Sequence, residues 1–156
     1  MATYEGTKTG ASGRFAIVAA RFNQSFVDRL VQGAKEGFER QGIAEESVDL
    51  VWVPGSFEVP LIAKQLAGSG RYAAVVCLGA VIRGDTDHYE YVAGEAARGV
   101  AEASSSTGVP VIFGILTCAT EEQALDRAGG KEGNKGYDAA LAALEMANLL
   151  RQLPGQ

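Results

Sequence analysis

Short, almost wholly apolar runs alternate along this chain with longer segments whose apolar residues recur every three or four positions. A short continuous apolar run is typical of a strand buried on both faces, and the longer period is typical of a helix that covers a sheet. Strands are therefore predicted at 15–20, 48–53, 73–78 and 109–116. Strands that alternate with helices form a parallel sheet with right-handed crossovers.

The helices are predicted from their apolar faces and their end signals. Phe26, Leu30, Ala34 and Phe38 define one apolar face after the first strand. Further helices are expected at 57–66, 89–104, 120–128 and 137–151, with a glycine-rich break at 129–136. Four strands with about five helices fit an α/β fold of the flavodoxin-like type, a three-layer sandwich with a four-stranded parallel sheet. We expect residues 13–156 to form one domain after an N-terminal arm at 1–12, which pairs with a neighbouring subunit.

Composition argues against several functional classes. The net charge of −5, without any Lys/Arg-rich run, disfavours a nucleic-acid partner. No apolar stretch is long enough to span a membrane, and residues 1–10 lack the apolar core of a signal peptide, so a cytoplasmic protein is expected. Cys77 and Cys118 lie in or beside apolar segments and are expected in the core. With a single histidine, no transition-metal site is expected.

The loop at 79–88, after the third predicted strand, is the first candidate for a site. It contains Arg83, Thr86 and His88, the only histidine of the chain. Backbone N–H groups at the start of the following helix favour an anionic ligand there. Taken alone, His88 is equally well a surface residue at a helix start, and Arg83 equally well forms a salt bridge or contacts a ligand.

The other loops after strands add groups suited to a flat heterocycle, a polyol chain and a phosphate. They contain Phe22 and Asn23 in the first loop, Ser56, Phe57 and Glu58 in the second, and Arg127 beyond the fourth strand. Each has a structural alternative: an aromatic that caps the core, a helix cap, or a charge beside a helix dipole. All are expected on one rim, and their coincidence favours a binding site.

Five segments resemble the lumazine synthase family in order and spacing, over nearly the whole chain. They are Ala-Arg-Phe-Asn at 20–23, Val-Pro-Gly-Ser-Phe-Glu-Val-Pro at 53–60, Leu-Gly-Ala-Val-Ile-Arg-Gly-Asp-Thr-Asp-His-Tyr-Glu-Tyr-Val at 78–92, Pro-Val-Ile-Phe-Gly at 110–114 and Gly-Lys-Glu-Gly-Asn-Lys-Gly at 130–136. The resemblance implies a transferase of riboflavin biosynthesis that needs no cofactor. It would condense 5-amino-6-(D-ribitylamino)uracil with 3,4-dihydroxy-2-butanone 4-phosphate to 6,7-dimethyl-8-ribityllumazine, releasing phosphate and water.

The resemblance also implies roles for the matching residues. His88 would transfer protons, and Phe22 would stack on the pyrimidine. Further substrate contacts are implied for Asn23, Ser56, Phe57, Glu58, Ala80, Val81, Ile82, Gly84, Asp85, Thr86, Phe113, Arg127 and Lys135. Within this set, 56–58 would hold the ribityl chain, 81–82 would line the ring pocket, and 84–86 with Arg127 would bind the phosphate. Phe113 would come from the neighbouring subunit.

The assembly implied by the resemblance is a homo-oligomer of pentamers, in the form of a sixty-subunit icosahedral shell that associates with riboflavin synthase. Two residues depart from the family's pattern. Asp85 places a carboxylate beside the expected phosphate site, and Glu132 adds a charge to the turn that the family associates with shell assembly.

Two other classes remain open. One is a non-catalytic shell or flavin-binding protein of the same fold, which could lose His88 or Arg127, although both are present here. The other is a signalling receiver domain. That class needs an acidic cluster and a phosphate-accepting aspartate at a strand end, whereas the third predicted strand leads into Leu-Gly-Ala at 78–80.

Overall fold

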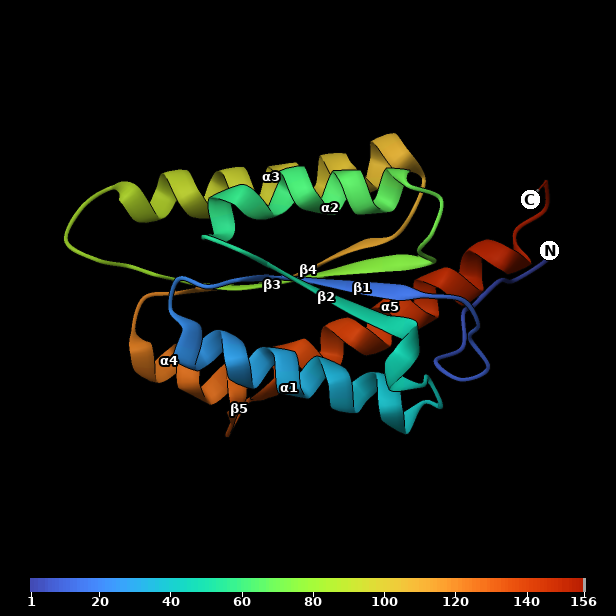
Figure 1. Cartoon of the computed structure of the whole chain (residues 1–156), viewed down its shortest axis with the longest axis horizontal. Helices are drawn as coiled ribbons and strands as arrows, with labels where there is room; N and C mark the ends of the chain where they lie inside the picture. Colours follow the sequence, from blue (N-terminus) through green and yellow to red (C-terminus); the bar gives the residue numbers. More distant parts are fainter. Residues whose placement is uncertain (156) are drawn as a thin grey trace.

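A four-stranded parallel sheet forms the middle layer of the computed structural model, which describes residues 1–155. Its strands are β1 (Phe15–Ala20), β2 (Val48–Val53), β3 (Ala74–Ile82) and β4 (Val111–Cys118), in the order β2-β1-β3-β4. Figure 1 shows α2 (Val59–Gly68) and α3 (His88–Thr107) on one face, with α1 (Gln24–Arg40), α4 (Glu121–Arg127) and α5 (Lys135–Gln152) on the other. The predicted three-layer α/β sandwich is confirmed.

The central strands are buried on both faces because helices cover each side of the sheet. All six residues of β1 are buried. Phe15 and Ile17 pack on the side of α1 and α5, whereas Ala16 and Val18 pack on the side of α2 and α3. This alternation explains why β1 reads in the sequence as one continuous apolar run.

Both cysteines belong to this core, as predicted. Cys77 and Cys118 are buried and free, and they lie in the core layers on opposite faces of the sheet. Burial raises the pKa of both thiols. The residues therefore act as small apolar side chains.

Strand β3 is longer than the sequence suggested. Residues 79–82 were expected in a loop, but they pair with Ile115–Cys118 of β4 and continue the strand to Ile82. The loop before α3 therefore begins at Arg83. Strand β4 is displaced in the same direction: it begins after Pro110, which has no N–H to donate, and ends at Cys118.

Polar side chains and short turns define the ends of the helices. Glu45–Ser47 and Ser56–Glu58 form single 3₁₀ turns before β2 and α2. Thr120 caps α4 by accepting a hydrogen bond from the backbone N–H of Gln123 at 3.1 Å. At the predicted glycine-rich break, β5 (Ala128–Gly130) and β6 (Gly133–Asn134) form a short antiparallel hairpin, which begins at Ala128, a residue predicted in the preceding helix. None of the helices in residues 1–155 is long and apolar enough to cross a membrane.

Glycine at position 136 allows α5 to approach α1 closely. A Cβ atom at Gly136 would overlap the main-chain carbonyl oxygen of Leu30. Just before it, Asn134 accepts hydrogen bonds from the N–H groups of Gly136 and Tyr137, at 2.8 and 3.1 Å. The hairpin, the helix cap and the helix contact therefore meet at one point.

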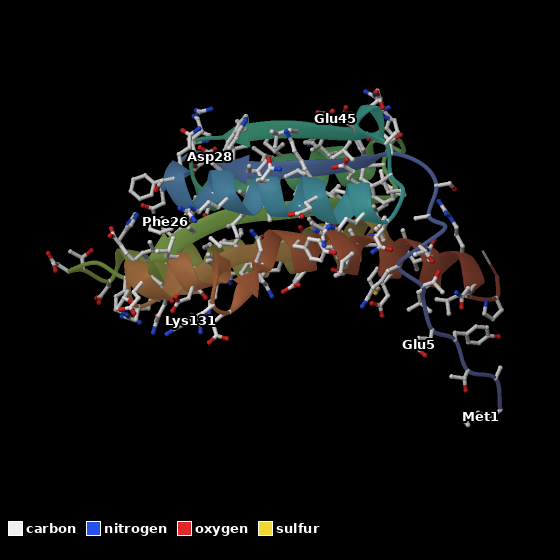
Figure 2. All side chains as sticks on the ribbon, turned by 90° about the horizontal axis from the view of Figure 1, so that it is seen from below. Met1, Glu5, Phe26, Asp28, Glu45 and Lys131 are labelled. Carbon is white, nitrogen blue, oxygen red and sulfur yellow. The ribbon has the colours of Figure 1, made fainter. Side chains whose placement is uncertain are left out.

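The N-terminal arm lies against α5 without forming a helix or strand. Asn148, which is buried, donates its side-chain amide to the carbonyl oxygens of Thr7 and Thr9, at 2.7 and 3.1 Å. Figure 2 shows Met1 and Glu5 at the periphery, and both chain ends lie at one end of the molecule in Figure 1. Pairing of this arm with a neighbouring subunit stays a prediction.

Candidate functional site

A cavity of about 730 Å³ opens at the carboxyl ends of β1, β2 and β3. Strand order reverses here, because β2 lies on one side of β1 and β3 on the other. Ligands of doubly wound sheets bind at such a reversal. The cavity is lined by Phe22, Asn23, Pro54, Gly55, Ser56, Phe57, Glu58, Ala80, Val81, Ile82, Gly84, Thr86, His88, Tyr89, Tyr91 and Val92.

This cavity brings together most of the residues predicted for the site. Every candidate from the first three loops and from the end of β3 is among its lining residues, with the exceptions of Arg83 and Asp85. Asp85 is exposed on the loop between Arg83 and α3. Phe113, Arg127 and Lys135 line a different cavity.

Two aromatic rings at the mouth of the cavity are exposed to solvent. Phe22 has 72% of its surface accessible and Phe57 has 54%, so neither ring is a cap on the core of the single chain. Exposed aromatic faces at a mainly apolar cavity suit stacking on a flat ring. Ser56, which directly precedes Phe57, is buried, and its hydroxyl fills the space where a side chain at Gly79 would lie.

The end of β1 is joined to β3 through Asn23. Its backbone is left-handed, with φ 61° and ψ 42°, a conformation that asparagine adopts more readily than most residues. Its side-chain amide donates to the carbonyl oxygen of Ala80 at 2.8 Å. The amide that was predicted to contact substrate is thus already engaged across the strand reversal.

His88 is the first residue of α3 and is exposed at the cavity wall. Its backbone N–H donates to the Thr86 hydroxyl at 3.3 Å. It is therefore both a surface residue at a helix start and a lining residue of the cavity. Its imidazole is available to a bound ligand.

Arg83, for which the sequence left two interpretations, forms a salt bridge within the chain. Its Nη1 lies 2.8 Å from Oε1 of Glu90 in the first turn of α3. The guanidinium carbon also lies 4.5 Å from the ring centroid of Tyr89.

The second cavity, of about 400 Å³, lies along the edge strand β4 and extends to α4 and α5. It is lined by Phe113, Ile115, Leu116, Thr117, Cys118, Arg127, Glu132, Lys135 and Asp138. We predicted Arg127 on the same rim as Gly84 and Thr86, but within one chain it lines this second cavity. The physical reason is that α4 and α5 pack over β3 and β4 on the same face as α1, whereas Gly84 and Thr86 lead into α3, which packs on the opposite face.

The two cavities differ in charge. Among the described residues that line the first, there is no lysine or arginine, and its titratable side chains include Glu58 and His88. The second contains Arg127 and Lys135 together with two carboxylates. Residues 1–155 include no group of three or more His, Cys, Asp or Glu side chains that could hold a metal ion.

Some lining residues were not singled out from the sequence. Tyr89, Tyr91 and Val92 follow His88 in α3, and Asp138 follows Lys135 in α5. A signal was present, because residues three or four positions apart share one face of a helix. Tyr91 and Val92 are three and four positions after His88, and Asp138 is three after Lys135.

A comparison with protein families agrees with this geometry. The family model described as 6,7-dimethyl-8-ribityllumazine synthase matches residues 12–151. The matched range includes the four strands of the sheet and every residue that lines the two cavities. The chain therefore belongs to the 6,7-dimethyl-8-ribityllumazine synthase family.

Proposed function

We propose that this protein condenses 5-amino-6-(D-ribitylamino)uracil with 3,4-dihydroxy-2-butanone 4-phosphate. Its family forms 6,7-dimethyl-8-ribityllumazine, an intermediate of riboflavin biosynthesis. The observation that carries the proposal is the first cavity, where exposed aromatic rings, hydroxyl and carboxylate groups and the only histidine converge at the strand reversal. A mainly apolar cavity of this size, with aromatic rings and a few polar groups, suits a pyrimidine with a polyol chain.

In the proposed complex, Phe22 stacks on the pyrimidine, and Val81 and Ile82 line the ring pocket. The ribityl hydroxyls lie against Ser56, Phe57 and Glu58. A carboxylate accepts hydrogen bonds from hydroxyls, and the Ser56 hydroxyl both donates and accepts. The backbone N–H groups at Gly84 and Thr86, before the start of α3, are aimed at the phosphate.

The reaction needs proton transfer more than it needs a nucleophile from the protein. The amine of the pyrimidine adds to the ketone, and loss of water gives an imine. Phosphate is then eliminated, and the second nitrogen closes the ring with loss of water. An imidazole both accepts and donates protons near neutral pH, so His88 serves these steps. The larger part of the acceleration comes from holding the two substrates in register.

We further propose that the complete site lies between two copies of the chain. The phosphate needs a cation, and the first cavity has no lysine or arginine among its described lining residues. Arg127 and Lys135, with Phe113, line the second cavity along the edge strand. An arginine fork suits a phosphate well. In the proposed assembly, the second cavity of one subunit faces the first cavity of its neighbour.

This pairing of two different surfaces is a head-to-tail contact, which gives a ring when the rotation from one subunit to the next closes. We propose rings of five subunits that assemble into an icosahedral shell, with riboflavin synthase as a partner. The arm at 1–12 would pair with the exposed edge of a neighbouring sheet. Light scattering and sedimentation distinguish a free pentamer from a shell, and a monomer under assay conditions would contradict the shared site.

The activity is tested by mixing the two substrates with the protein and following lumazine absorbance. We expect product well above the uncatalysed rate. A rate equal to that background would contradict the proposed reaction and favour a non-catalytic flavin-binding or shell protein.

The shared site is tested by co-expressing two variants, His88→Ala and Arg127→Ala. In mixed assemblies about a quarter of the sites combine an intact first cavity with an intact second cavity from the neighbour, so activity should exceed that of either variant alone. The control is co-expression of His88→Ala with Phe22→Ala. Both of these alter the first cavity, so no site is fully intact. Equal activities of the two mixtures would contradict a shared site.

A further inference from the structure

Arg83 joins the two ends of the loop that precedes His88. Its backbone N–H donates to the carbonyl oxygen of Cys118 at the end of β4, at 2.9 Å. Its side chain forms the 2.8 Å ion pair with Glu90 and lies over the ring of Tyr89 at 4.5 Å. One residue therefore connects the sheet to the first turn of α3.

The loop has little other support. Residues 84–87 are exposed, and a Cβ atom at Gly84 would have no neighbour within 4 Å. The hydrogen bonds of this stretch are local: Thr86 accepts from the N–H of His88, and Asp87 accepts from the N–H of Glu90. Among the described residues, Arg83 makes the contacts that connect the two ends of this loop.

The residues that Arg83 holds belong to the cavity or adjoin it. Tyr89 is a lining residue, and His88 precedes it in the helix. An exposed ion pair contributes little to global stability, and an exposed cation–π contact adds only a small amount. We therefore expect the ion pair and the cation–π contact to affect the local order of the loop more than the stability of the whole domain.

We propose that Arg83 is a positioning residue, which holds the loop so that His88 and the N–H groups of Gly84 and Thr86 face the bound substrates. This inference rests on the proposed function. It differs from a direct contact between Arg83 and the phosphate, because the guanidinium is already engaged by Glu90 and Tyr89. It requires that loss of Glu90 have the same consequence as loss of Arg83.

The test compares Arg83→Ala, Arg83→Lys, Glu90→Gln, Arg83→Glu and the exchanged pair Arg83→Glu with Glu90→Arg. Arg83→Ala and Glu90→Gln should each lower kcat by about three- to tenfold, the size expected for loss of exposed contacts. Backbone hydrogen exchange should become faster in the peptide that covers 83–90 and stay unchanged in the sheet. Arg83→Lys should keep most of the activity, and the exchanged pair should recover part of the loss seen in Arg83→Glu.

The chain offers a matched control in Arg40. Its Nη2 lies 2.7 Å from Oε1 of Glu36, and its guanidinium lies 5.9 Å from the ring centroid of Tyr137. None of these three residues lines either cavity. Arg40→Ala should therefore leave kcat and the hydrogen exchange of 83–90 unchanged.

Two results would overturn the proposal. One is wild-type exchange and wild-type kcat in both Arg83→Ala and Glu90→Gln. The other is a rise in KM for the phosphate substrate in Arg83→Ala with no effect of Glu90→Gln, which would make Arg83 a direct ligand of the substrate. A wild-type protein that forms no lumazine contradicts the proposed function instead, and the exchange rates then still decide whether Arg83 holds the loop.

Discussion

Asn23 donates its side-chain amide to the carbonyl oxygen of Ala80, and this 2.8 Å hydrogen bond joins β1 to β3 at the point where strand order reverses. Asn23 is also the non-glycine residue with positive φ in residues 1–155. The backbone turns sharply at this position, directly after the exposed ring of Phe22. The hydrogen bond therefore fixes the edge of the cavity at which we propose that the pyrimidine stacks.

Substitution of Asn23 should separate the contribution of its side-chain hydrogen bond from the cost of its left-handed backbone. Asn23→Ala loses the hydrogen bond and places a β-carbon in the left-handed region, so the free energy of unfolding should fall by about 2 kcal/mol. Asn23→Gly loses only the hydrogen bond at little conformational cost, and the fall should be about 1 kcal/mol. Urea unfolding measures both values. Equal losses in the two variants would show that the left-handed backbone is not maintained.

The imidazole of His88 should matter moderately. His88→Ala should lower kcat by roughly ten- to a hundredfold, at or below the low end of general acid–base effects, because positioning of the substrates remains. Steady-state kinetics with each substrate varied in turn separates kcat from KM. Complete loss of turnover with normal substrate binding would contradict a reaction accelerated mainly by positioning.

Arg127 should matter more than His88, and in a different kinetic constant. Arg127→Ala removes the charge-assisted fork proposed for the phosphate, and KM for the phosphate substrate should rise by about a hundredfold. Arg127→Lys keeps the charge without the fork, so its KM for the phosphate substrate should lie between those of the wild type and Arg127→Ala. An unchanged KM for the phosphate substrate would contradict the phosphate assignment.

At the opposite end of the sheet, Asp49 accepts two side-chain hydrogen bonds. The Tyr72 hydroxyl donates to one carboxylate oxygen at 2.6 Å, and Nη2 of Arg14 donates to the other at 2.7 Å. The hydrogen bond from Tyr72, with a smaller effect of Arg14, holds the pKa of Asp49 below its ordinary value of 3.8, against the opposing effect of burial. The same hydrogen bond raises the pKa of Tyr72 above 10.0.

These shifts predict a pH window for the contribution of this pair to stability. The depressed pKa of Asp49 means that its contribution is present above 3.8 and is lost as pH falls through the lower pKa of the folded state. The raised pKa of Tyr72 means that its contribution is present below 10.0 and is lost at higher pH. Tyr72→Phe should therefore lower the free energy of unfolding most between about pH 5 and pH 9. A difference from the wild type that does not vary with pH would contradict this coupling.

Two glycine substitutions should have opposite effects on stability. Gly136→Ala drives a methyl group into the main-chain oxygen of Leu30, and α5 must move away from α1. A loss of about 3 kcal/mol or more is expected, since backbone cannot yield as a flexible side chain does. Gly94→Ala in α3 meets nothing within 4 Å and should increase stability by about 0.5–1 kcal/mol. Thermal unfolding of both variants under one set of conditions makes the comparison.

Local pattern was sufficient to predict the core of the fold. Strand β1 was predicted with the bounds that it has, because a strand buried on both faces must be apolar throughout. The end of β3 was missed because Gly79 and Arg83 resemble loop residues. The pairing that makes 79–82 a strand involves β4, more than thirty residues away, and local periodicity carries no information about such a partner.

The cavity residues also divide into those that local sequence could place and those that it could not. Phe22, Ser56 and His88 could be placed together because each follows a strand of one parallel sheet, and the carboxyl ends of such strands share an edge. Arg127 is the last residue of an additional helix, α4, and its position depends on the face of the sheet against which that helix packs. Nothing in the local sequence specifies that face, so its placement required the three-dimensional structure.

The distribution of charge between the two cavities has a consequence for how defects in this protein will be recognised. In the proposed site, a solitary chain carries the histidine and the aromatic rings, but the described residues that line its first cavity include no lysine or arginine for the phosphate. Turnover then obeys the law of mass action for subunit association, and the specific activity of the protein should fall on dilution. A substitution on the outer edge of β4 that only weakens association would thus be mistaken for an active-site lesion, unless activity is measured over a range of protein concentrations.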